Sequence, residues 1–243
     1  SKVERILRLI EELLRLLREA LRKIHRINEE LIRTLEEVLR EIHRINEDLN
    51  RKLREATGRN DDLDRADTES EKLNRDLRRR NEEVLKRLRE SNKRLKEEND
   101  RVDKKIKKLL EDLERIVKDR PEALEELVKI LEEIIRDIER LLRKNREVHE
   151  ENIRLIEELL KENIEAHERD LKLIEDLIRR ENLPEELKDR VREELDRSRK
   201  KLRKLEEEMR RKLKRSREEL KKLEEDLRRE LKKLREELER IRR

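Results

Sequence analysis

Apolar residues recur at intervals of three and four along nearly the whole chain, and almost all of them are Leu, Ile or Val. This period places them on one side of an α-helix. Turn signals interrupt the pattern at only three places, which are Thr57-Gly58, Asp119-Arg120-Pro121 and Asn182-Leu183-Pro184. Gly permits the left-handed residue that ends many helices, and Pro is tolerated in the first turn of a helix. The pattern therefore predicts four helices, over about 2–56, 61–119, 121–182 and 184–243.

The three connections between these helices are very short. Asn60 or Asp61 can cap the helix that follows the first connection. Short connections force neighbouring helices to run antiparallel, and each helix should be roughly 85 Å long at the rise of an α-helix. The sequence thus predicts an all-α protein, a long up-down-up-down four-helix bundle that forms a single domain over 1–243.

The width of the apolar stripe differs between the helices. In the helices 2–56 and 121–182 it covers about half of the circumference, whereas in 184–243 it covers less than a quarter, and 61–119 is intermediate. A bundle with a diamond cross-section explains this difference, with 2–56 and 121–182 as the inner helices and the other two outside. In the alternative, the wide faces of the inner helices also contact another chain.

The stripe also has a regular period. In the last helix it runs from Ser198 to Ser216 in 18 residues and from Ser216 to Leu234 in another 18. Eighteen residues in five turns is 3.6 residues per turn, the period of a straight α-helix. We therefore expect nearly straight helices and no left-handed supercoil.

Polar residues interrupt the stripes of all four helices at this same interval of 18. Counted from the end where the first helix starts, they fall at two heights, about 27 Å apart by helical rise. We call these two sets layer 1 and layer 2. Layer 1 consists of His25, Asn28, Asn92, Asn99, Asn145, His149 and Ser216. Layer 2 consists of His43, Asn46, Asn74, Asn81, Asn163, His167 and Ser198.

Burying such side chains without partners costs about 1–3 kcal/mol each, so we expect both layers to be buried, closed hydrogen-bond networks. The chain resembles computationally designed helical bundles with modular buried hydrogen-bond networks. The features that carry this resemblance are idealised helices of Leu, Glu, Lys and Arg, Pro and Gly that occur only in loops, and polar layers that are copied along the chain. The designs with buried His that respond to acid are the most similar. This resemblance covers the whole chain and implies a designed scaffold without a natural substrate. Many such designs are assemblies of two-helix hairpins, which leaves a hairpin-based assembly subunit open.

Three interpretations of the four His follow. They can simply fix which helix faces which, as buried Asn does in coiled coils. They can also form a pH switch, because His changes its charge between pH 5 and 8. In the third, His25 with His149 and His43 with His167 would each ligate a haem, although bulky residues leave little room for one.

The composition excludes several other functions. The chain has 72 Lys and Arg mixed with 67 Asp and Glu, a net charge of +5 and no Cys. Interspersed charges are unlike the basic stripe of nucleic-acid binders. No Glu-x-x-His occurs at any His and no Gly-rich loop is present, so we expect no catalytic residue, no metal and no cofactor. With no stretch of 18 apolar residues and no signal-peptide pattern, we expect a soluble, untargeted protein of unknown localisation. We expect it to bind no nucleic acid and, at neutral pH, no membrane. The sequence favours a monomer and leaves a homo-oligomer open.

Overall fold

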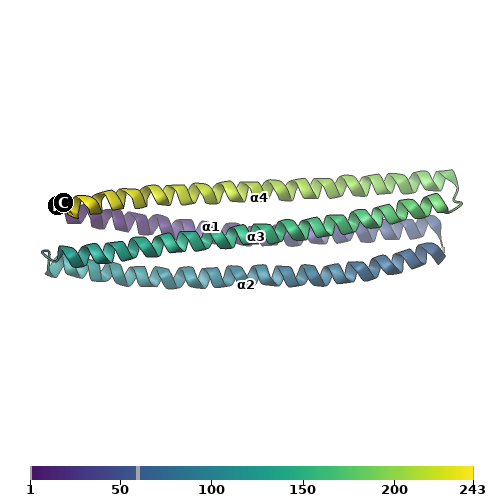
Figure 1. Cartoon of the computed structure of the whole chain (residues 1–243). Helices are drawn as coiled ribbons and strands as arrows, with labels where there is room; N and C mark the ends of the chain where they lie inside the picture. Colours follow the sequence, from purple (N-terminus) through teal and green to yellow (C-terminus); the bar gives the residue numbers. More distant parts are fainter. Residues whose placement is uncertain (1, 59–60, 243) are drawn as a thin grey trace. The chain divides into compact units, whose positions relative to one another are not determined.

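Four α-helices account for almost the whole chain. A computed structural model describes residues 2–58 and 61–242, apart from the side chains at 56–57 and 62–63. The helices are α1 (Lys2–Thr57), α2 (Asp61–Asp119), α3 (Leu124–Arg180) and α4 (Glu185–Arg242), and Figure 1 labels each of them along the chain. Among the described residues there is no strand. The predicted all-α four-helix architecture is confirmed.

The helix ends differ from the predicted ones mainly at α3. This helix begins at Leu124 rather than at 121, because Pro121 lies in a turn closed by a bond from the Ala123 amide to the Arg120 carbonyl, 3.0 Å. At α4, Pro184 precedes the first helical residue, and its carbonyl accepts bonds from the amides of Leu187 and Lys188. Asn60, one of the two predicted caps of α2, lies outside the described residues.

Gly58 ends α1 in the left-handed conformation, as its sequence context predicts. Its φ is +65°, and its amide donates to the Arg54 carbonyl at 3.0 Å. A Cβ at this position would meet no atom within 4 Å, so the requirement for Gly comes from the backbone conformation and not from crowding.

We expect Gly58→Ala to lower the free energy of unfolding by about 1 kcal/mol, because a left-handed backbone strains any residue with a Cβ. Gly58→Asn should cost less, since Asn tolerates this conformation better than Ala. Guanidinium unfolding at pH 7.5 measures both changes. Equal stability of the Ala variant and the parent would contradict this account of the turn.

The chain folds as two compact units, each built from segments of all four helices. Unit 1 comprises residues 1–29, 90–151 and 214–243, and unit 2 comprises 30–89 and 152–213. In unit 1 the core includes Ile10, Leu113, Ile134 and Leu231. In unit 2 a cluster at one end of the core is formed by Leu49, Leu53, Leu171, Ile174, Ile178, Val191 and Leu195. That the whole chain behaves as a single domain stays a prediction.

The apolar side chains are distributed as the stripe widths predict. Among the described residues, α1 and α3 supply 17 and 15 buried apolar side chains, whereas α2 and α4 supply 5 and 9. Ion pairs between helices support the same arrangement. Helix α2 is paired with α1 through Arg18–Asp103 and with α3 through Lys105–Asp137. Helix α4 is paired with α1 through Lys52–Glu194 and with α3 through Arg146–Glu224. Within each unit, α1 and α3 are the inner helices.

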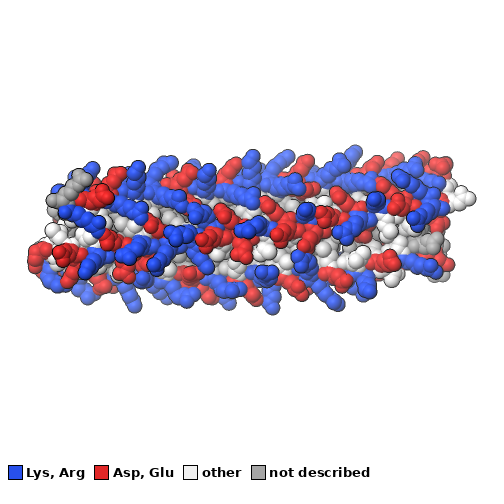
Figure 2. Space-filling view, in the orientation of Figure 1, with Lys and Arg blue, Asp and Glu red and all other residues white. Residues whose placement is uncertain are grey.

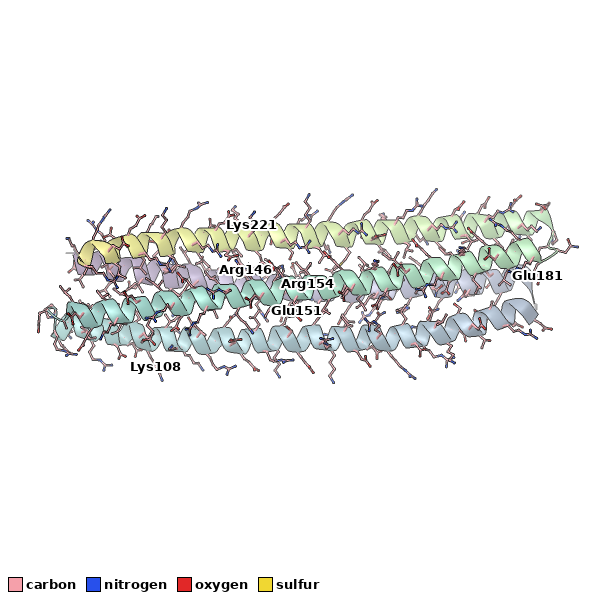
Figure 3. All side chains as sticks on the ribbon, viewed as in Figure 1. Lys108, Arg146, Glu151, Arg154, Glu181 and Lys221 are labelled. Carbon is pink, nitrogen blue, oxygen red and sulfur yellow. The ribbon has the colours of Figure 1, made fainter. Side chains whose placement is uncertain are left out.

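The surface carries both charges in close mixture. Figure 2 shows Lys and Arg alternating with Asp and Glu over the visible face, and Figure 3 shows Lys108 and Lys221 projecting away from their helices. Many of these residues form exposed ion pairs one helical turn apart, such as Arg240 with Glu237 at 2.9 Å. Such pairs contribute a few tenths of a kcal/mol each. None of the described helices contains a segment long and apolar enough to span a bilayer.

Candidate functional site

Each polar layer lies within one unit: all members of layer 1 belong to unit 1 and all members of layer 2 to unit 2. Most of them are buried, as predicted from their place in the apolar stripes. The buried members are Asn28, Asn92, Asn99, Asn145, His149 and Ser216 in layer 1, and Asn46, Asn81, Asn163, His167 and Ser198 in layer 2. His25, His43 and Asn74 are half-buried instead. The helical spacing therefore predicted the position of the layers correctly, but the full burial that it predicted for these three residues is wrong.

Both layers contain one reciprocal pair of amides between α2 and α3. In layer 1 the Nδ2 atoms of Asn99 and Asn145 donate to each other's Oδ1 at 3.0 and 2.9 Å. In layer 2 Asn81 and Asn163 repeat this at 2.9 and 2.8 Å. Asn145 also donates to the Leu141 carbonyl one turn earlier in α3, at 2.7 Å. Nearly every polar atom of these buried amides thus has a partner, as buried polar groups require.

His149 joins three helices of unit 1. Its Nδ1 lies 2.6 Å from Oδ1 of Asn28 on α1, and its Nε2 lies 3.1 Å from Oγ of Ser216 on α4. An amide oxygen only accepts, so Nδ1 carries the proton and Nε2 accepts from the serine hydroxyl. Burial, and to a smaller extent the nearby positive charge of Arg217, lower the pKa of His149 from 6.5 to about 4. The layer therefore holds this imidazole in its neutral form.

His25, the other histidine of layer 1, does not join that network. Its Nε2 lies 2.9 Å from Oε1 of Glu29, one turn along α1, and its side chain is 25% exposed. The expectation of a buried histidine within a closed network is wrong for His25, because its ring turns toward the solvent edge of α1, where Glu29 is within reach. With His25 bonded to Glu29 and His149 to Asn28 and Ser216, the paired arrangement required by a bis-His haem site is not formed in layer 1.

His43 lies at the edge of layer 2. Its Nε2 lies 3.4 Å from Nδ2 of Asn81, and its ring lines a groove of about 390 Å³ between α1 and α2. Burial lowers the pKa of His43, the charge of Arg78 lowers it further, and Glu47 opposes both. His43 is thus closer to solvent than His149, and a carboxylate faces it.

His167 is buried with neither ring nitrogen bonded to any described group. It is 2% exposed, and both Nδ1 and Nε2 are shielded from solvent. Burial lowers its pKa to about 4, and the nearby imidazole of His43 contributes in the same direction. The expectation of a closed network is therefore wrong at this residue.

Asp170 explains why layer 2 differs from layer 1, and the sequence interpretation missed it. Nδ2 of Asn46 donates to Oδ2 of Asp170 at 3.2 Å, whereas its layer 1 counterpart Asn28 turns its oxygen to His149. The carboxylate of Asp170 attracts the amide hydrogens of Asn46, so Asn46 does not bond His167. As a result, Oδ1 of Asn46 is buried without a partner.

The 18-residue repeat could have revealed Asp170. The matching position in α3 is Asn152, which is also buried, at 4% against 7% for Asp170. The predicted layers contain only positions at which the same residue type recurs after 18 residues. Asn152 and Asp170 occupy such positions with two different residue types and were therefore not included. A search for buried polar positions at the same interval, whatever their type, would have included both.

Burial raises the pKa of Asp170, and the polar side chains of Asn46, Ser70 and Asn74 together with Arg169 oppose this rise. Asn46 lies on α1 and the other two polar groups lie on α2, so the carboxylate of α3 is surrounded from two further helices. Layer 2 thus contains one acidic group that layer 1 lacks.

The chain matches no protein-family model, no curated protein and no solved structure. Across residues 2–58 and 61–242, no three His, Cys, Asp or Glu side chains converge closely enough to hold a metal ion. What the layers offer chemically is hydrogen bonding and proton uptake by buried imidazoles.

Proposed function

We propose that the chain is a designed structural scaffold without a natural substrate, and that its two polar layers fix the packing of the helices and make the stability of the bundle depend on pH. The design origin is supported by the idealised helices and the repeated layers. The function rests on the buried polar groups alone and involves no catalysis and no cofactor.

The observation that carries this proposal is the environment of His149. Its ring is 3% exposed and engages Asn28 and Ser216 from two other helices, and its pKa lies at about 4. Bonds of this kind are satisfied only when α1, α3 and α4 are in one register, which gives packing specificity. Protonation places a charge in this buried site and makes Nε2 a donor, so Ser216 must then act as an acceptor.

A double variant, His149→Gln with His167→Gln, tests the pH dependence. Gln keeps an amide in each layer but does not titrate, so guanidinium midpoints of this variant at pH 7.5 and 4.5 should be close to each other. The parent chain should have a clearly lower midpoint at pH 4.5. His25→Gln is the matched control, because His25 is half-buried and bonded to Glu29, and it should leave the acid sensitivity of the parent in place.

We further propose that the scaffold is a monomer at neutral pH. The wide apolar faces of α1 and α3 are buried among the chain's own four helices, and among the described residues only Leu73, Leu124 and Leu173 are large, exposed apolar side chains. Light scattering at pH 7.5 should give a molar mass near the 30.3 kDa of the chain. A mass of twice this value would favour the hairpin-based assembly.

A further inference from the structure

A groove lies between α3 and α4 in unit 1, beside layer 1. Its volume is about 400 Å³, and its lining reaches from Leu142 to Glu150 on α3 and from Arg217 to Arg228 on α4, with Ile24 of α1 between them. Sites for small organic molecules have volumes of ~300–1,000 Å³ and are mostly apolar, with a few polar groups that fix the orientation of the ligand. The groove has the volume of such a site.

The inner part of the groove is apolar. Ile24 and Leu142 are core residues that are 4% and 5% exposed, and Leu220 of α4 is half-buried. The one titratable group in this inner part is His149, which is neutral and whose ring nitrogens are bonded to other members of layer 1. An occupant must therefore present an apolar surface to this part of the groove.

Long charged side chains form the edge of the groove. Figure 3 shows two of them, Arg146 on α3 and Lys221 on α4, at about the same point along unit 1. Four of the lining residues are positive and three are negative: Arg146, Arg217, Lys221 and Arg228, with Glu150, Glu224 and Glu225. Glu224 is engaged by Arg146 at 3.0 Å and by Arg228 at 2.6 Å, whereas Lys221 forms no ion pair with a described side chain. One negative charge on an occupant would balance the edge.

The 18-residue repeat provides an internal comparison in unit 2. Ten of the twelve lining residues recur there with the same type, and an eleventh is again basic. The twelfth is Arg146, whose counterpart is Ile164. Ile164 is 7% exposed, and Leu202, the counterpart of the half-buried Leu220, is 3% exposed. A buried apolar side chain thus fills in unit 2 the position that Arg146 leaves open in unit 1, where its guanidinium turns to Glu224.

We propose that the groove between α3 and α4 of unit 1 binds a small aromatic monoanion, a fused two-ring system that carries one sulfonate or carboxylate group. The rings lie against Ile24, Leu142 and Leu220, and the anionic group lies at the edge near Arg217 and Lys221. The lining stretches of α3 and α4 are about 12 and 16 Å long by helical rise, which is enough for two fused rings. Flat rings also suit an edge rich in Arg, because guanidinium groups stack on aromatic faces.

Titration with anilinonaphthalene sulfonate at pH 7.5 tests the site, because the fluorescence of this dye rises in an apolar environment. We expect one bound molecule per chain, with a dissociation constant on the order of 10–100 µM for a ligand of this size. Arg146→Ile, which copies the residue of unit 2 into the groove, should weaken binding about ten-fold, because a buried side chain takes the place of the rings. Guanidinium midpoints at the same pH check that each variant is folded.

The anionic group is tested separately. Arg217→Gln should weaken binding of the dye about three-fold, the size expected for an exposed charge pair. The matched control is Arg199→Gln, the same change at the equivalent position of unit 2, and it should leave binding as in the parent chain. Phenylnaphthylamine has the same rings without the sulfonate, and it should bind more weakly than the dye.

Equal binding by the parent chain and Arg146→Ile would overturn the proposal, because the dye would then bind elsewhere on the surface. Equal losses in Arg217→Gln and Arg199→Gln, or binding of the uncharged analogue as tight as that of the dye, would overturn the preference for an anion at this groove. The titration is run at constant neutral pH and leaves all four His unchanged, so its outcome is independent of the acid sensitivity proposed above.

Discussion

Lowering the pH from 7.5 to 4.5 should reduce the free energy of unfolding by about 5 kcal/mol. Burial holds the pKa of both His149 and His167 at about 4, against 6.5 in an unfolded chain. At pH 4.5 each of them then contributes a loss of about 2–3 kcal/mol, because protons bind the unfolded chain more tightly. A typical domain has a total stability of about 5–15 kcal/mol, so the effect is large.

The direction follows from the sign of these shifts. For a histidine with a lowered folded pKa, the stabilising contribution is fully present above pH 6.5, and it is lost as the pH falls toward 4. His43 acts in the same direction, because burial and Arg78 lower its pKa more than Glu47 raises it. Asp170 acts in the opposite direction: its raised pKa means that its burial destabilises the fold at neutral pH and that acid relieves this cost.

Guanidinium unfolding at a series of pH values between 7.5 and 4 measures this dependence. We expect a midpoint that is constant above pH 7 and falls between pH 6.5 and 4, with full unfolding in acid only if the apolar core is weak. Equal midpoints at pH 7.5 and 4.5 in the parent chain would refute the pH-dependent function and leave packing specificity as the role of the layers.

Asn145→Leu should lower the free energy of unfolding by about 3 kcal/mol. The change removes two hydrogen bonds with Asn99 and leaves the amide of Asn99 buried without its partner. An unsatisfied buried polar atom costs about 1–3 kcal/mol, and Asn99 would have two of them. Chemical unfolding at pH 7.5, where the buried His149 of the same layer is neutral, measures the loss without interference from its protonation.

The double variant Asn145→Leu with Asn99→Leu is the informative control. Replacing both partners of a buried pair by apolar groups leaves no polar atom unsatisfied, so we expect stability within about 1 kcal/mol of the parent or above it. The same pair of measurements on Asn163 and Asn81 should give the same result, because the reciprocal bonds of that pair have the same geometry. Additive losses in the double variant would mean that the amides act independently, contrary to the structure.

The sequence by itself determined the helices, their order and the place of the layers. The period of 3.6 residues fixes which residues share a face, and so the stripe widths predicted that α1 and α3 are the inner helices. The sequence also identified Gly58 as the end of a helix. Many helices end with a residue in the left-handed conformation, which Gly adopts more readily than residues with a Cβ, and Gly58 has this conformation. Eleven of the fourteen predicted layer residues are buried, because burial follows from the helix face.

The partners of those residues were decided only by the tertiary structure. Spacing along a helix places a side chain at a height and on a face, but side-chain rotation and the neighbouring helices decide what it touches. His25 and His149 both belong to layer 1, yet one bonds Glu29 on its own helix and the other bonds Asn28 and Ser216 on two others. His167 repeats His149 along α3, but it has no partner because Asp170 attracts the amide of Asn46. Hydrogen bonds act over about 3 Å, so one changed neighbour is enough to make two copies of the same sequence pattern differ.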